Sequence, residues 1–179
     1  AVNKQMSHLQ MGSAQIELNF EDLPFEQWNK VGSTKIELMY KPSAQMTARP
    51  FRKIASGGEV SRVMLACKVV LGESDDCDTL VFDEVDAGVG GTTAVALAEV
   101  LAQLAKTHQV IVVTHLPQVA VLASKHYVVS KTEEHNALPI TLLTEVSGTQ
   151  REEEIARMLS GSITEASLAH AHELLTEVR

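Results

Sequence analysis

The sequence contains few cysteines, few aromatic residues and no long apolar run. Its two cysteines, Cys67 and Cys77, have no CxxC spacing. This argues against a disulfide scaffold or a zinc ribbon and is typical of a reducing, cytoplasmic compartment. Aromatic residues make up 4% of the chain, so a surface that stacks nucleic-acid bases is not expected. No run of about 18 apolar residues occurs, so we expect no membrane-spanning segment and no membrane partner.

We do not expect the first residues to form a signal peptide, and the chain has no excess of basic charge. Residues 1–5 have neither an initiator methionine nor the apolar core of a signal peptide, and we expect them to come from the middle of a longer protein. The 179 residues are 45% hydrophobic and 21% charged, a composition typical of a globular domain. The net charge of −8 is concentrated after residue 55, which argues against a broad electrostatic DNA footprint on this chain.

Hydrophobic periodicity predicts an N-terminal helix and hairpin. Residues 2–11 place Val2, Met6 and Leu9 near one helical face. Residues 15–20 and 35–40 alternate apolar and polar side chains, so we expect two strands that pair as an N-terminal β-hairpin. Residues 41–50 contain two prolines and are predicted to form a loop.

The rest of the chain alternates helices and strands. The pattern predicts helices over 58–71, 93–106, 150–159 and 165–178, a short helix from Pro117, and strands over 79–82, 109–113, 126–130 and 140–146. On the helix over 93–106, the predicted apolar face comprises Val95, Ala98, Leu101, Ala102 and Ala105. This alternation predicts an α/β fold with a largely parallel sheet flanked by helices.

Ser56, Gly57, Gly58 and Glu59 begin one of the predicted helices. Ser56 and Glu59 have the spacing of a capping box. The two glycines allow another chain to approach, and the N–H groups of a helix start attract anions. An ordinary capped helix explains the same four residues, so this motif is weak by itself.

Two adjacent carboxylates follow the apolar strand over 79–82. Asp83 and Glu84 would lie at the carboxyl end of that strand, where ligands bind in open α/β sheets. Their side chains should point in different directions, so that one can hold Mg²⁺ and the other can act as a general base toward water. The plainer alternative is a strand that ends in an acidic turn.

Two further polar residues are expected near the same edge. Asp86 follows within one turn, where capping or turn formation is its simplest role. His115 ends the apolar run Val110–Thr114, and a histidine at that edge could contact a phosphate. A single histidine is usually structural, but its place after a buried strand makes this one a candidate.

The four features, taken in order, resemble the signature motif, Walker B strand, D-loop and H-loop of ABC-type ATPases. The S-G-G-E and D-E-V-D sequences look like the SMC and Rad50-like branch rather than transporters. Longer stretches are similar to a bacterial family of DNA double-strand-break repair proteins in that branch: Lys53–Lys68, Phe82–Gly91, Val113–Ala120 and Arg151–Gly161. The resemblance extends over essentially the whole chain.

The resemblance implies a role for each motif residue. Ser56, Gly57 and Gly58, with Glu59 completing the motif, would contact the γ-phosphate of ATP held by an opposing head. Asp83 would support Mg²⁺, and Glu84 would be the catalytic base. Asp86 would lie at the interface between two heads, and His115 would sense the γ-phosphate. The implied partners are an N-terminal P-loop lobe of the same protein, a second head, and DNA through the full-length protein, at the nucleoid.

A P-loop is missing from this chain. No G-x-x-x-x-G-K-[ST] sequence occurs, and no glycine is followed by lysine. In the family that the chain resembles, this motif lies in an N-terminal lobe beyond a long coiled coil. We therefore interpret residues 1–14 as the stump of a coiled-coil helix and residues 15–179 as the C-terminal lobe of the ATPase head. We expect the isolated chain to be inactive.

Two other functions remain open at this stage. A non-catalytic head that only dimerises or tethers would keep the fold, although it has no need for both Asp83 and Glu84 at the ligand edge. The nucleotide-binding subunit of a membrane transporter would carry its P-loop upstream in one continuous domain, and the 55 residues before Ser56 contain none.

Overall fold

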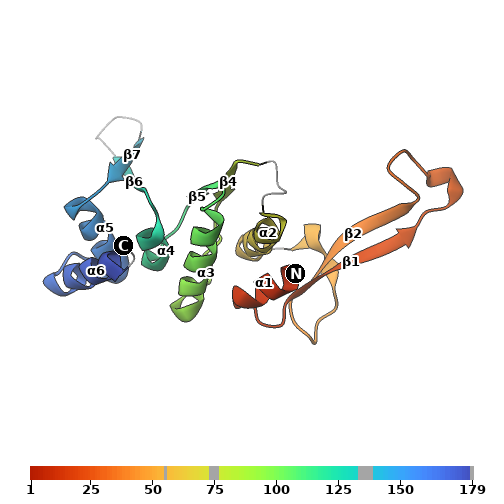
Figure 1. The fold of residues 1–179 in the computed structure, drawn as a ribbon, viewed down its shortest axis with the longest axis horizontal. Coiled ribbons are helices and arrows are strands. Elements are labelled where there is room, and N and C mark those ends of the chain that lie inside the picture. The colour runs from red at the N-terminus through yellow and green to blue at the C-terminus, as the bar shows by residue number, and fades with distance from the viewer. Residues whose placement is uncertain (55, 73–76, 133–138, 178–179) are drawn as a thin grey trace. The chain divides into compact units, whose positions relative to one another are not determined.

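The computed structural model describes residues 1–54, 56–72, 77–132 and 139–177. Ala55, within one of the resembling stretches, and Val178, at the end of a predicted helix, lie outside the described residues. The chain divides into two compact units, one comprising residues 1–89 and 103–113 and the other residues 90–102 and 114–179. Figure 1 shows the elements in chain order.

The first unit combines an antiparallel sheet, two helices and a parallel strand pair. Its elements are α1 (Val2–His8), β1 (Gln15–Asp22), the 3-10 turn η1 (Phe25–Gln27), β2 (Thr34–Lys41), β3 (Arg49–Pro50), η2 (Phe51–Lys53), α2 (Gly57–Leu71), β4 (Thr79–Phe82) and β5 (Gln109–Val112). Helix α1 contacts α2. The buried side chains of this unit include Met6, Leu9, Val63 and Leu65.

Strands β1 and β2 form the predicted N-terminal hairpin (Figure 1). Ile16 pairs with Tyr40 and Phe20 with Ile36, so one face of the ribbon is apolar along its length. The prediction of a loop over 41–50 is wrong at its end, because β3 pairs there with β2. Pro50 has no N–H to donate, and a short strand at a sheet edge tolerates that loss.

Strands β4 and β5 are parallel, as predicted. Thr79 is in register with Gln109 and Phe82 with Val112. The Val113 N–H donates to the Phe82 carbonyl over 2.9 Å, which extends the pairing by one residue. This short pair sets the direction in which the chain leaves each strand at its carboxyl end.

The second unit contains most of α3 (Gly91–Leu104), followed by α4 (Pro117–Leu122), β6 (His126–Thr132), β7 (Ile140–Val146), α5 (Thr149–Ser160) and α6 (Glu165–Glu177). The predicted apolar face of α3 is partly wrong, because Val95 is 47% exposed and Ala105 is also exposed. The buried positions follow the spacing i, i+3, i+4, i+7 from Ala94: Ala94, Leu97, Ala98 and Leu101.

Strands β6 and β7 are antiparallel, with His126 in register with Val146. The described residues therefore hold one parallel pair and two antiparallel sheets, so the prediction of a largely parallel sheet is corrected, while the α/β class is confirmed. Only seven residues separate β6 from β7. A parallel connection needs a crossover of a dozen or more residues, so this pair can only form a hairpin.

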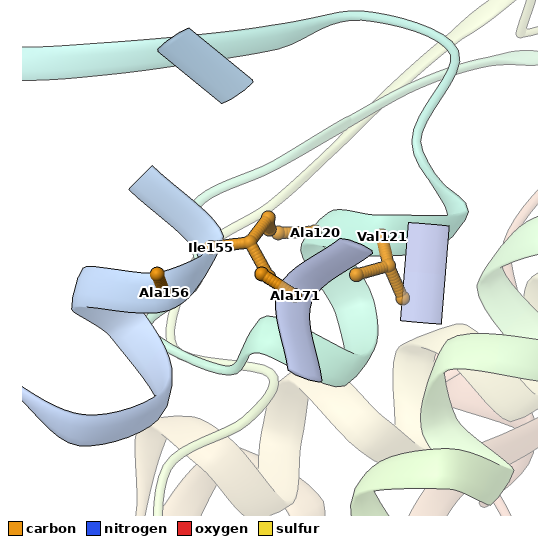
Figure 2. Close-up of a cluster of buried hydrophobic side chains, with 5 residues drawn as sticks. All are labelled: Ala120, Val121, Ile155, Ala156 and Ala171. Carbon is orange, nitrogen blue, oxygen red and sulfur yellow. The ribbon is translucent and has the colours of Figure 1, made fainter. Parts of the chain in front are cut away.

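Helices α4, α5 and α6 share a small apolar core, shown in Figure 2. Its buried members are Ala120, Val121, Ile155, Ala156 and Ala171. Helix α5 ends at Gly161, whose left-handed φ of 77° is the usual helix-terminating conformation. Over the described part of the chain, no helix combines the length and the apolarity that crossing a membrane requires.

Candidate functional site

The start of helix α2 is capped as the sequence predicts. Ser56 has extended backbone angles, and its hydroxyl oxygen accepts a hydrogen bond from the Glu59 N–H over 3.3 Å. Ser56 and Gly57 are exposed, whereas Gly58 is buried. The helix therefore presents its first residues to solvent and packs its second glycine against the protein.

Asp83 and Glu84 lie directly after β4, and both are exposed. Glu84 has a positive backbone φ of 56°, which a residue with a Cβ rarely adopts. After it the chain turns tightly, since the Ala87 N–H donates to the Glu84 carbonyl and the Val89 N–H to the Asp86 carbonyl, each over 3.0 Å. We call residues 83–89 the carboxylate loop. The two exposed carboxylates therefore belong to a loop whose backbone has a positive φ and is held by turn hydrogen bonds.

Helix α2 packs closely on the carboxylate loop through its two glycines. A Cβ at Gly57 would collide with Oε2 of Glu84. A Cβ at Gly58 would lie 2.9 Å from the Ala87 Cβ and 3.0 Å from the Glu84 carbonyl oxygen. Only glycine permits this approach. The structure thus brings together Ser56, Gly57, Gly58, Asp83 and Glu84, which the sequence motifs had placed at separate positions.

Side chains of α2 also bond to the backbone of this loop. The Ser61 hydroxyl donates to the Asp83 carbonyl over 2.8 Å. The Arg62 guanidinium donates through one nitrogen to the carbonyls of Val85 and Ala87, over 3.1 and 2.9 Å. These three hydrogen bonds hold the loop at points before and after Glu84.

A partly buried cluster of polar groups lies beside these contacts. Burial raises the pKa of Tyr40 to about 12, and the negative charge of the nearby Glu59 adds to this rise. Burial lowers the pKa of the Arg62 guanidinium, while the charge of Glu59, the Tyr40 phenol and the charge of Asp86 oppose that change. Asp86 is 3% exposed. It belongs to this cluster rather than to the exposed carboxylates.

His115 belongs to the second unit. It is exposed and lies between Val113 and α4, after the end of β5. The Leu116 N–H donates to the Thr114 hydroxyl over 3.0 Å, and Pro117 begins α4 as predicted. The chain therefore turns directly from the strand through His115 into a helix.

The carboxylates fit a magnesium site only in part. Across residues 1–54, 56–72, 77–132 and 139–177, no group of three or more His, Cys, Asp or Glu side chains could hold a metal ion by itself. Mg²⁺ usually takes one or two protein carboxylates and completes its shell with substrate phosphates and water. The exposed Asp83 and Glu84 fit the part of the shell that protein carboxylates supply.

Reasoning from the sequence missed Tyr40, Ser61 and Arg62. A signal for the last two was present, because Gly58, Ser61 and Arg62 have the spacing i, i+3, i+4 of one helical face. Two polar residues on the face of a buried glycine indicate polar neighbours on another segment. Tyr40 lies on a different element and carries no such signal.

No protein-family model matches the chain. The chain is 49% identical over 144 residues to the DNA repair protein RecN of Deinococcus radiodurans, covering 80% of this chain and 25% of that protein. It is 39% identical over 180 residues to RecN of Xylella fastidiosa, covering 97% of this chain and 31% of that protein. It thus spans only about a quarter to a third of the length of these relatives.

A solved structure supports the fold. The Smc head domain from Pyrococcus yayanosii, with a coiled coil and joint, matches 89% of this chain and 28% of that chain with a TM-score of 0.60 at 17% identity. At this identity the likeness establishes the fold alone. It confirms that the chain has the fold of this part of an Smc head domain.

Proposed function

We propose that this chain, which is homologous to a segment of the bacterial DNA repair protein RecN, is the C-terminal part of an ATP-hydrolysing head. In this proposal it supplies the signature helix start and the catalytic carboxylate to ATP that is sandwiched between two heads. One observation carries the proposal: the exposed Asp83 and Glu84 follow a parallel strand, and Glu84 lies against the glycine start of α2.

Each carboxylate would have its own task. Mg²⁺, when bound with ATP, offsets the negative charge of the phosphate oxygens. Asp83 would hold this ion, directly or through water. The Glu84 carboxylate would accept a proton from water as the water oxygen forms a bond to the γ-phosphorus and the bond to the ADP oxygen breaks.

The start of α2 would act on ATP bound by a second head. The first N–H groups of a helix have no acceptor within the helix and favour an anion. Exposed Ser56 and Gly57 present such groups, and Glu59 completes the motif one turn into the helix. Asp86 would act by supporting the loop at the head–head interface. A contact of His115 with the γ-phosphate stays a prediction.

The chain needs a P-loop lobe to complete this site. Its 179 residues contain no G-x-x-x-x-G-K-[ST] motif, and that motif provides the phosphate cradle and a direct Mg²⁺ ligand. Two exposed apolar surfaces support a partner of this kind. One lies on β4 and β5 and comprises Val81, Ile111 and Val113; the other, on the hairpin, comprises Leu18, Phe20 and Ile36.

The whole protein would use the ATP cycle to close and release two heads and so change how DNA is held. This part of the proposal rests on the similarity to relatives that are DNA repair proteins. It includes a cytoplasmic location at the nucleoid. The low aromatic content and the acidic charge of this chain agree with DNA contact elsewhere in the protein.

The decisive experiment measures ATP hydrolysis by this chain alone, by the P-loop lobe of the same protein alone, and by the two mixed. Activity on mixing, lost when the chain carries Glu84→Gln, is the expected result. Hydrolysis by this chain alone would contradict the proposal. If calorimetry detects binding of the two lobes and the mixture still does not hydrolyse ATP, the non-catalytic interaction module becomes the better description.

A further inference from the structure

Three hydrogen bonds from α2 hold the backbone on both sides of Glu84. Ser61 bonds to the carbonyl of Asp83, just before Glu84, and Arg62 bonds to the carbonyls of Val85 and Ala87, after it. A non-glycine residue with φ near 56° persists only where its surroundings impose that conformation. Ser61 and Arg62 therefore determine where the Glu84 carboxylate lies.

Arg62 lies among groups that favour its charged form. Glu59 lies one helical turn before it on α2, and Asp86 lies in the carboxylate loop. Burial lowers the pKa of the Arg62 guanidinium, and the charges of Glu59 and Asp86 oppose that change. A charged guanidinium makes stronger hydrogen bonds to the loop carbonyls than a neutral donor would.

The two bonds made by Arg62 depend on its position relative to α2. A single guanidinium nitrogen donates to both carbonyls, so a small displacement of the side chain weakens both bonds together. A displacement of Arg62 would therefore loosen the backbone at both carbonyls that follow Glu84.

We propose that Arg62 is a positioning residue that fixes the backbone of the carboxylate loop and thereby the place of the Glu84 carboxylate. The consequence for catalysis rests on the proposed function. The positioning itself does not, because it concerns only the loop conformation of this chain.

The test measures hydrogen exchange of single amides by NMR in the 179-residue chain without nucleotide. The Ala87 and Val89 amides report on the carboxylate loop, and the Gln109 amide, which donates to the Asp78 carbonyl, reports on the parallel pair. Arg62→Met should speed exchange of the two loop amides by about tenfold or more, because hydrogen bonds from a charged group are lost. The Gln109 amide should change little.

Two milder variants keep the test valid if Arg62→Met fails to fold. Arg62→Lys keeps the charge but loses the guanidinium geometry, so it should restore only part of the loop protection. Ser61→Ala removes the bond to the Asp83 carbonyl and should speed exchange of the same two loop amides by a smaller factor. Arg157→Met is the matched control, since Arg157 bonds to Glu154 on its own helix.

The outcomes separate this inference from the proposed function. The positioning role would be overturned if the Ala87 and Val89 amides exchanged at the normal rate in Arg62→Met. It would also be overturned if the Gln109 amide accelerated as much as they do. In the full-length protein, Arg62→Met should lower kcat for ATP and leave KM unchanged. If Glu84→Gln does not alter hydrolysis there, the catalytic proposal fails while the exchange result still decides the role of Arg62.

Discussion

Glu84 illustrates how much a single residue depends on its backbone. Its φ of 56° turns the chain directly after β4, so the carboxylate is exposed while Val85 and Asp86 are buried. An ordinary β conformation would continue the strand and carry the next residues past α2. The strained backbone at this position is thus part of the candidate site.

At the residue scale, the first prediction concerns the general base. In a complete head, Glu84→Gln should keep ATP binding, because the amide is nearly the same size, and should slow hydrolysis by about 10²–10⁴-fold. Steady-state turnover and nucleotide titration measure the two quantities. Glu17→Gln, an exposed glutamate on β1, is the matched control. Equal turnover of Glu84→Gln and the wild-type head would remove Glu84 from this role.

Tyr40 gives a prediction about pH. Its pKa is raised from 10.0 to about 12 in the folded chain, mainly by burial. The folded state therefore favours the neutral phenol, and this contribution to stability is complete below pH 10 and is lost as the pH rises toward 12. Urea unfolding across this range should show a fall in the free energy of unfolding that Tyr40→Phe reduces.

The control for this pH prediction is the other tyrosine of the chain. Tyr127→Phe removes an exposed phenol on β6 and leaves Tyr40 as the only tyrosine. The ultraviolet absorbance of tyrosinate in that variant then reports Tyr40 alone, and we expect it to titrate near pH 12. Titration near pH 10 would contradict burial as the cause of the raised pKa.

At the scale of elements, the site depends on the packing of α2 against the carboxylate loop. The sequence predicts the helix start and the strand separately, and the glycines explain how closely they meet. Gly57 faces a flexible carboxylate, whereas Gly58 faces the Ala87 side chain and the loop backbone. The contact at Gly58 therefore has less freedom to adjust.

This difference predicts the effect of adding one methyl group. Gly58→Ala should lower the free energy of unfolding by about 1–3 kcal/mol, because its Cβ would press on the Ala87 Cβ and the Glu84 carbonyl. Gly90→Ala is the control, since a Cβ there meets nothing within 4 Å. Its stability should change by less than about 1 kcal/mol. Equal unfolding midpoints in urea for the two variants would contradict this packing.

At the scale of the whole molecule, the exposed apolar surfaces are the main unexplained feature of the isolated chain. On the hairpin, Leu18, Phe20 and Ile36 are 57%, 62% and 60% exposed and lie on one face. Apolar patches of this kind commonly mark protein interfaces. The proposed P-loop lobe would cover such a face and remove it from water.

Phe20→Lys tests this interpretation. It should leave the free energy of unfolding within about 0.5 kcal/mol, because the ring is largely exposed. It should weaken binding to the P-loop lobe by about tenfold or more, since burying a phenylalanine contributes 1.5–3 kcal/mol. Calorimetry measures the affinity, and Asn19→Lys, at the adjacent position on the opposite face of β1, is the control. Equal affinities of the two variants would place the lobe elsewhere.

Much of the fold and part of the site follow from local patterns. The hairpin, the parallel pair and the helices agree with hydrophobic periodicity, and the Ser56 cap agrees with its spacing to Glu59. Periodicity does not show which strands pair, so it missed β3 and the antiparallel β6–β7 hairpin. The roles assigned to individual site residues stay predictions.

The sequence alone determined the order of the motifs, the positions of most helix starts and strands, and the resemblance to ATPase heads, because capping, periodicity and motif spacing are local properties. Only the tertiary structure placed Gly57 against Glu84, joined Arg62 to the carboxylate loop and gave Glu84 its left-handed backbone. These features depend on contacts between residues more than twenty positions apart, and no local pattern in the chain encodes such contacts.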